Sequence, residues 1–190
     1  AIVTAAADSI RQLSLPNYVL DPVMVATSGD LLIEKEAIEA ILNELLPLAA
    51  LITPNAHEAA VLTGMSIDTF DEMKTAAESL VRKGAKAVLI KGGDLQASRS
   101  TGIVDLLYDG EFTEFSHDRI ESTSTHGTGC TLSAAIAAQL ALGDSLGGSV
   151  ATAINYVQQA IRSAPGLGAG HGPLNHFAGG SAATNSFTRS

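Results

Sequence analysis

The sequence predicts an α/β fold, in which a mostly parallel sheet is covered by helices on both faces to give three α/β/α layers. Short apolar segments alternate with segments of about 10 to 15 residues whose apolar positions follow a helical period. This alternation is typical of parallel sheets, because the crossover helices cover both faces. One hairpin signal, Asp109-Gly110, predicts two antiparallel strands near one edge.

The expected elements follow one another along most of the chain. Helices are expected at residues 2–13, 34–46, 57–62, 71–83, 129–142 and 149–163, and strands at 18–21, 50–53, 87–90, 104–108 and 111–115. Pro47 and Gly64 end two of the helices, because proline lacks a backbone N–H and glycine favours helix C-termini. Residues 1–177 are expected to form one domain, and the small polar residues 178–190 a flexible tail.

Composition and charge narrow the possible functions. The 190 residues suffice for one domain with a real core, and 46% of them are hydrophobic. The net charge of -9 argues against a nucleic-acid groove or an anionic membrane surface, both of which need basic patches. A small anionic ligand remains possible because it needs only local donors. A single cysteine excludes an internal disulfide and favours a reducing compartment. Neither a membrane span nor a signal peptide is expected from the sequence.

Four loops at the carboxyl ends of expected strands carry polar residues, and ligands bind at this edge of open α/β sheets. In the first loop, the Asp21 carboxylate suits magnesium, held directly or through water, or it simply caps a turn. In the second, Asn55 ends a strand and Glu58 falls on the first turn of the next helix. This pair fits an ordinary helix cap, or a hydrated magnesium near a triphosphate.

The third loop begins at Lys91, which ends a strand and precedes Gly92 and Gly93. The glycines allow the backbone to approach a ligand closely, and the lysine supplies positive charge. The alternative is a plain strand-ending turn with a solvated lysine.

The fourth loop, STSTHGTGCT, leads into a helix and contains the only cysteine. Its residues Gly127, Thr128, Gly129 and Cys130 lie where the helix begins, and the unpartnered N–H groups of a first turn bind anions. The glycines leave room for a phosphate, although a Gly-rich loop with a buried cysteine is the alternative. The loop is not a P-loop, because no Gly-Lys-Ser/Thr follows.

Five segments together resemble the hydroxymethylpyrimidine/phosphomethylpyrimidine kinases of thiamin biosynthesis, in the ribokinase-like superfamily. They are LDPVMVATSGDLL, ITPNAHEAAVLTG, AVLIKGGDL, STHGTGCTLSAAIAA and GHGPLNHF, spread over residues 20–177. The Thr-His-Gly-Thr-Gly-Cys-Thr run is the most specific, because most sugar kinases of the superfamily carry Gly-Ala-Gly-Asp there. The resemblance implies that residues 1–177 are the carboxyl-terminal two thirds of a ribokinase-like domain, since the family's opening strand and Ala-Gly-Ser-Asp-Ser-type loop are not matched.

The resemblance implies a two-step reaction. ATP would phosphorylate the hydroxymethyl group of 4-amino-5-hydroxymethyl-2-methylpyrimidine, and a second ATP would phosphorylate the resulting monophosphate. Gly127, Thr128, Gly129 and Cys130 would form the anion hole around the transferring phosphoryl group. Cys130 would accept the substrate proton, and a helix N-terminus is expected to lower its pKa toward the thiolate. The alternative is that Cys130 only fills space.

ATP and Mg²⁺ are the implied cofactors. Lys91, Asn55, Glu58 and Thr128 would bind the nucleotide, while Asp21 and Glu58 would lie in the magnesium shell. The adenine is expected near residues 104–120 and the last two helices.

The implied partners are the pyrimidine substrate and ATP, in a cytoplasmic protein that is a homodimer at full length. Two alternatives stay open. One is a pyridoxal-type kinase of the same superfamily, and the other is a non-catalytic, ligand-binding kinase-like module.

Overall fold

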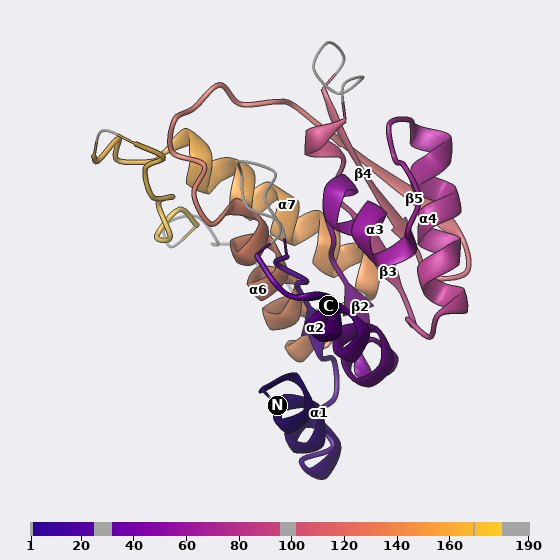
Figure 1. The fold of residues 1–190 in the computed structure, drawn as a ribbon. Coiled ribbons are helices and arrows are strands. Elements are labelled where there is room, and N and C mark those ends of the chain that lie inside the picture. Colours follow the sequence, from indigo (N-terminus) through magenta and orange to yellow (C-terminus); the bar gives the residue numbers. More distant parts are fainter. Residues whose placement is uncertain (1, 25–31, 96–101, 169, 180–190) are drawn as a thin grey trace, which may run out of the picture.

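A computed structural model describes residues 2–24, 32–95, 102–168 and 170–179, and confirms the predicted α/β class (Figure 1). The α-helices are α1 (Ile2–Gln12), α2 (Lys35–Ala40), α3 (Ala56–Thr63), α4 (Phe70–Arg82), α6 (Thr128–Ala141) and α7 (Leu146–Arg162). The strands are β1 (Val19–Leu20), β2 (Leu51–Ile52), β3 (Val88–Ile90), β4 (Ile103–Tyr108) and β5 (Phe112–His117). Three short helical turns are η1 (Ile41–Leu45), η2 (Leu46–Leu48) and η3 (Gly92–Asp94).

The five strands form one sheet in the order β1-β2-β3-β4-β5. The β1–β2 and β2–β3 pairs are parallel, whereas β4 runs antiparallel to both β3 and β5. Four of the five strands therefore point in one direction, and the carboxyl ends of β1, β2 and β3 meet at one edge. The predicted hairpin is confirmed: Tyr108 pairs with Phe112 across a turn in which Gly110 has a φ of 112°.

Two hydrophobic layers enclose this sheet, because successive strand residues point to opposite faces. Val88 and Ile90 pack toward α1, α3 and α4, whereas Leu89 packs toward α6 and α7. Leu106 and Leu107 divide between the faces in the same way. Figure 1 shows α6 and α7 on one side of the strands and α3 and α4 on the other. The three-layer arrangement is as the sequence predicts.

Two helices differ from the prediction by more than one residue at an end. The expected helix at 34–46 is divided into α2, a π-helical turn and a 3₁₀ turn that ends at Leu48. Pro47 lies within this last turn and has no N–H for a regular helical bond, so the helix cannot continue. Helix α7 begins at Leu146, ahead of the predicted start, because Ser145 caps it by accepting a hydrogen bond from Gly148 N at 3.2 Å.

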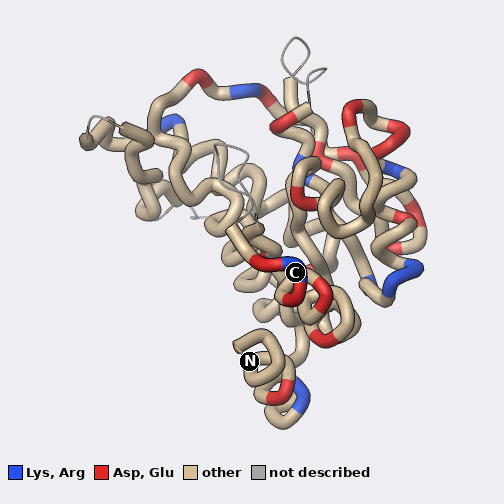
Figure 2. The backbone as a smooth tube through the Cα atoms, viewed as in Figure 1, with Lys and Arg blue, Asp and Glu red and all other residues tan. Residues whose placement is uncertain are grey.

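Charged residues are unevenly distributed over the two helical layers. Helix α6 carries no charged residue and α7 carries only Arg162, whereas α2 and α4 carry several acidic residues and α3 carries Glu58 (Figure 2). Charged groups near the start of α6 must therefore come from other elements.

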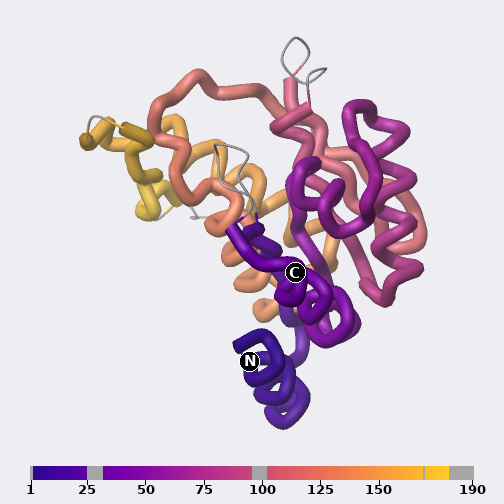
Figure 3. Tube along the Cα trace, viewed as in Figure 1, coloured from indigo at the N-terminus to yellow at the C-terminus, as the bar shows by residue number. Residues whose placement is uncertain are grey.

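A long connection, residues 118–127, runs from β5 to α6 and arches over the space between them (Figure 3). The GHGPL segment supports it, because His126 N donates to Gly172 O at 3.3 Å and Gly172 N donates to Thr123 O at 3.1 Å. A Cβ on Gly172 would lie 2.7 Å from Ser124 Oγ, so only glycine fits this close approach. Residues 180–190 of the expected tail lie outside the described residues.

Candidate active site

Three of the four predicted loops meet at the carboxyl edge of the sheet. Asn55 and Lys91 form a parallel bridge beyond the ends of β2 and β3. Lys91 Nζ lies 3.3 Å from Asp21 Oδ1 and 3.9 Å from Glu58 Oε2. These side chains are largely buried, with 16% of Lys91, 15% of Asp21 and 4% of Glu58 exposed. The lysine is therefore not a solvated residue at the end of a strand. Its ammonium group lies between two buried carboxylates.

Asn55 and Glu58 form the helix cap that the sequence offered as one alternative. Asn55 Oδ1 accepts from Glu58 N and Glu58 Oε2 accepts from Asn55 N, both at 2.8 Å, which is a capping box for α3. Burial raises the pKa of Glu58, and the charge of Lys91 and the Asn55 N–H only partly offset this. The cap thus holds the carboxyl group of Glu58 in a buried position beside Lys91.

The first turn of α6 lies against the same lysine. Gly127 caps the helix with a φ of 80°, a left-handed conformation that favours glycine, and Thr128 Oγ1 donates to Thr125 O at 2.7 Å. A Cβ on Gly129 would lie 3.0 Å from Lys91 Nζ, so the absent side chain makes room for the ammonium group. First-turn N–H groups and a cation therefore converge, an arrangement suited to a phosphate.

A polar link that the sequence reasoning missed joins β2 to α6. Thr53 Oγ1 lies 2.8 Å from Ser133 Oγ, Ser133 Oγ donates to Gly129 O at 3.0 Å, and Thr53 Oγ1 also contacts Asp21 Oδ1 at 3.3 Å. Thr53 is fully buried. The signals for this link in the sequence were Thr53, a polar residue at the end of an apolar strand, and Ser133, a polar residue in an Ala-rich helix. The link fixes the start of α6 relative to Asp21.

Cys130 lies on the first turn of α6 as predicted, and it is exposed. The expected lowering of its pKa is not found, because partial desolvation by neighbouring atoms and the Asp21 carboxylate raise the pKa of the thiol above its usual value. Lys91 acts in the opposite direction but does not outweigh them. The helix N-terminus alone suggested a lower pKa, and the acidic neighbours could not be identified from the local sequence.

The acidic residues fit a magnesium ion that is held mainly through substrate phosphates. Asp21 Oδ2 is buried and has no hydrogen-bond partner among the described residues. Mg²⁺ prefers such carboxylate oxygens and usually keeps water and phosphate ligands in addition to one or two carboxylates. No group of three or more His, Cys, Asp or Glu side chains in the described part of the chain could hold a metal ion. Asp21 and Glu58 therefore fit a magnesium that is bound together with a nucleotide.

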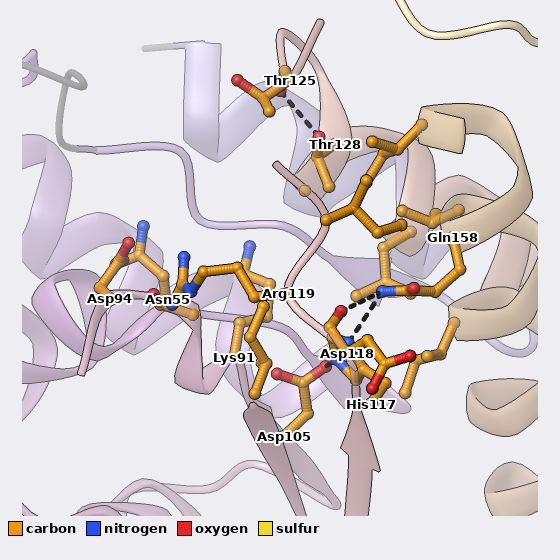
Figure 4. A pocket seen from close by; sticks show the side chains of 18 residues that line it. Asn55, Lys91, Asp94, Asp105, His117, Asp118, Arg119, Thr125, Thr128 and Gln158 are labelled. Carbon is orange, nitrogen blue, oxygen red and sulfur yellow. Dashed lines mark hydrogen bonds and ion pairs between the residues drawn. The ribbon is translucent and has the colours of Figure 1, made fainter. Parts of the chain in front are cut away.

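A pocket of about 420 Å³ extends from Lys91 and Thr128 to α7 (Figure 4). It occupies the place expected for adenine, between the segment that ends near residue 120 and the last two helices. Figure 4 shows Asn55 and Asp94 at one end of the pocket and His117, Asp118 and Gln158 at the other. The sequence reasoning named none of the residues at the second end.

The comparison with family models decides which family these residues belong to. A model described as phosphomethylpyrimidine kinase matches residues 1–175. The chain belongs to the phosphomethylpyrimidine kinase family. The recognition made from the sequence motifs is thereby confirmed.

Curated members of the phosphomethylpyrimidine kinase family agree with this assignment. The chain is 42% identical over 178 residues to the hydroxymethylpyrimidine/phosphomethylpyrimidine kinase of Bacillus subtilis, covering 93% of this chain and 65% of the relative. It is 48% identical over 179 residues to the enzyme of the same name from Rhizobium meliloti, covering 92% of this chain and 66% of the relative. The chain thus spans slightly less than two thirds of the length of these relatives.

Solved structures confirm the ribokinase-like fold. The pyridoxal kinase from Staphylococcus aureus in complex with AMP-PCP has a TM-score of 0.85 and 35% identity to this chain, covering 93% of it and 64% of that structure. Within the part of the chain that the structure describes, no helix is long and apolar enough to cross a membrane.

Proposed function

We propose that this chain forms the nucleotide-binding part of a kinase that phosphorylates 4-amino-5-hydroxymethyl-2-methylpyrimidine and then its monophosphate, using ATP. The observation that carries the proposal is the convergence of Lys91 with the first turn of α6 at the carboxyl edge of the sheet. Phosphoryl transfer needs this kind of positioning and charge neutralisation more than it needs covalent chemistry. The product serves thiamin diphosphate biosynthesis.

The residues around Lys91 have different roles in binding the nucleotide. Lys91 contacts the phosphates, and the backbone N–H groups of Gly129 and Cys130 face the transferring group. Gly127 and Thr128 shape the turn, in which Thr128 N donates to Thr125 O at 3.3 Å. Asn55 and Glu58 orient the phosphate side of the site through their capping box. A magnesium ion, when bound by Asp21 and Glu58, supplies the positive charge that Lys91 alone cannot provide against two carboxylates and a triphosphate.

Cys130 is the proposed proton acceptor for the hydroxymethyl group. Only its thiolate can accept a proton, and the raised pKa means that the thiol form dominates near neutral pH. A magnesium ion bound at Asp21 would favour the thiolate, because it would neutralise the carboxylate that raises the pKa of the thiol.

A pyridoxal-type kinase is the second candidate. The specific observation in its favour is the 0.85 TM-score to a pyridoxal kinase structure. The two candidates share the nucleotide site and differ only in the alcohol that reaches the phosphoryl group.

The cellular setting follows from the same proposal. We expect a cytoplasmic enzyme, because its single cysteine can form no internal disulfide, and a homodimer at full length. Its acidic net charge of -9 favours neither nucleic acid nor an anionic membrane as a partner.

A competition assay tests the substrate assignment. The full-length protein that contains residues 1–190 is incubated with magnesium-ATP and equal amounts of the pyrimidine alcohol and pyridoxal, and the products are identified by mass spectrometry. The pyrimidine monophosphate should form first and the diphosphate second. Dominant pyridoxal phosphate would favour the second candidate, and ATP binding without any phosphorylated alcohol would favour a non-catalytic module.

A further inference from the structure

A buried amide lines the far end of the pocket, opposite the phosphate side. Gln158, on α7, is 7% exposed, and its Oε1 has no hydrogen-bond partner among the described residues. Buried polar atoms are almost always paired, because desolvation without a partner is costly. An unpaired acceptor in the wall of a binding pocket therefore points to a donor on a ligand.

The orientation of this amide is fixed by its neighbours. Gln158 Nε2 donates to Asp118 O at 3.1 Å, and a backbone carbonyl can only accept, so the amide nitrogen must face Asp118. Nε2 also lies 2.9 Å from His117 Nδ1, which accepts in the neutral imidazole. Reversing the amide would set Oε1 against the carbonyl oxygen of Asp118. Oε1 is therefore the atom left with unused hydrogen-bonding capacity.

His117 is held in the matching tautomer by β4. Its Nε2 lies 3.1 Å from Asp105 Oδ2, and a carboxylate accepts the proton of that nitrogen. Asp105 Oδ1 accepts from Gly92 N at 2.9 Å, next to Lys91. A continuous set of hydrogen bonds thus connects the phosphate-side loop with the amide of Gln158.

Besides these polar groups, aliphatic side chains line the pocket. Its aliphatic lining comes from Ile103, Ile120, Leu132, Ile154, Val157 and Ile161. Aliphatic walls suit a flat aromatic ring, and the few polar groups among them give orientation and specificity. Since Lys91 lies at the phosphate end, a nucleotide would place its base here.

We propose that Gln158 selects the base of the nucleotide, with Oε1 accepting a hydrogen bond from the exocyclic amino group of adenine and His117 holding the amide in that orientation. This inference rests on the proposed use of ATP and adds the residue that distinguishes ATP from other nucleoside triphosphates. Inosine triphosphate carries an oxygen acceptor where ATP carries the amino group, and two acceptors repel each other. A site that hydrogen-bonds a donor group of its ligand strongly rejects an analogue without that group. A purely apolar site discriminates less between the two ligands.

The test compares the affinities of ATP and inosine triphosphate, measured by calorimetry with magnesium present. The wild-type protein should bind ATP at least about 10-fold more tightly, as expected for one buried hydrogen bond and one avoided repulsion. In Gln158→Leu the affinity for ATP should fall by about 10-fold, while that for inosine triphosphate changes little. Gln159→Leu is the matched control, because Gln159 is exposed on the same helix, and it should leave both affinities unchanged.

The pH dependence of this preference tests the positioning role of His117. Burial lowers the pKa of His117, but the hydrogen bond and charge of Asp105, together with Asp118, outweigh it and raise the pKa above 6.5. Arg162 of α7 lies 3.7 Å from Asp118. Protonated His117 would set an N–H against Gln158 Nε2. The preference for ATP should therefore decrease as the pH falls from about 8 to about 5.5.

The pH dependence should be absent in His117→Asn and in Gln158→Leu, since neither variant keeps the titrating pair. An equal loss of both affinities in Gln158→Leu would overturn the inference, because it would show a packing effect. A wild-type preference for ATP that Gln158→Leu retains would also overturn it, while leaving the proposed ATP use intact. Failure of the wild-type protein to bind either nucleotide would overturn the proposed function as well.

Discussion

At the scale of single residues, Cys130 is subject to opposing influences. The helix N-terminus and Lys91 favour a thiolate, whereas burial and the Asp21 carboxylate raise the thiol pKa. If the thiolate is the base, turnover in the full-length enzyme should increase with pH as Cys130 ionises. In Cys130→Asp this pH dependence should move to acidic pH, because a carboxylate is already ionised near neutrality.

Removal of the thiol tests whether Cys130 acts as a base at all. Cys130→Ala keeps the backbone N–H groups of the first turn, so the dissociation constant for ATP should change little. The turnover number should fall by about 10²–10⁴-fold, the usual contribution of general-base catalysis. Cys130→Asp should retain more activity than Cys130→Ala. Turnover of the alanine variant within about threefold of the wild type would show that the thiol only fills space.

Glu58 illustrates a conflict between stability and function. Its raised pKa means that the folded state binds this proton more tightly than the unfolded state, so its contribution to stability decreases as pH rises above about 4.5. Glu58→Gln keeps an acceptor for Asn55 N and removes the buried charge. It should raise the free energy of unfolding at pH 7 by an amount on the order of 1 kcal/mol.

The gain in Glu58→Gln should shrink toward pH 4, where the wild-type carboxyl is protonated in both states. Urea unfolding at several pH values measures this, and kinase activity measured in parallel should fall. A variant less stable than the wild type at pH 7 would show that pairing with Lys91 outweighs burial.

At the scale of elements, the turn η3 after β3 depends on close backbone packing. A Cβ on Gly92 would collide with the carbonyl oxygen of Val104 on β4, whereas the nearest atom to a Cβ on Gly93 is Ile103 Cδ1 at 4.0 Å. Gly92→Ala should therefore destabilise the chain by roughly 1–3 kcal/mol, and the matched Gly93→Ala should have an effect within about 0.5 kcal/mol. Denaturant unfolding compares the two, and equal losses would contradict the packing argument.

The elements that could be predicted are those with a local pattern. The apolar period predicts α4, and Asp109-Gly110 predicts the β4–β5 hairpin, whose strands begin and end close to the predicted positions. The π-helical turn after α2 has no such local pattern. It lies where the helix changes its hydrogen-bonding geometry ahead of the 3₁₀ turn that contains Pro47. Helix α7 begins early because Ser145 caps it, a signal present in the sequence but outweighed by the two glycines that follow.

At the scale of the whole molecule, topology explains which part of the site was predictable. Asp21, Asn55, Glu58 and Lys91 follow strands, and the carboxyl ends of parallel strands meet at one edge, so strand order predicts that they lie at this edge. The ion pairs of Lys91 with Asp21 and Glu58 were not predicted. The roles assigned to these residues stay predictions.

The opposite end of the pocket could not be predicted in this way. His117 and Gln158 are separated by 41 positions and lie on β5 and α7, which follow no shared motif. Gln158 occupies a helical position that a sequence pattern cannot distinguish from a solvated one. Only the packing of α7 against the sheet buries its amide and places it beside His117.

The central claim is that residues 1–190 hold the nucleotide side of a kinase site. The most direct measurement is the thermal unfolding of this chain with and without millimolar magnesium-ATP, because a ligand that binds only the folded state must stabilise it. We predict that the melting temperature rises by roughly 5 °C or more. The rise should be lost in Gly129→Val, whose side chain would occupy the space of Lys91 Nζ at the first turn of α6. An unchanged melting temperature in a wild-type chain that unfolds cooperatively would contradict the account.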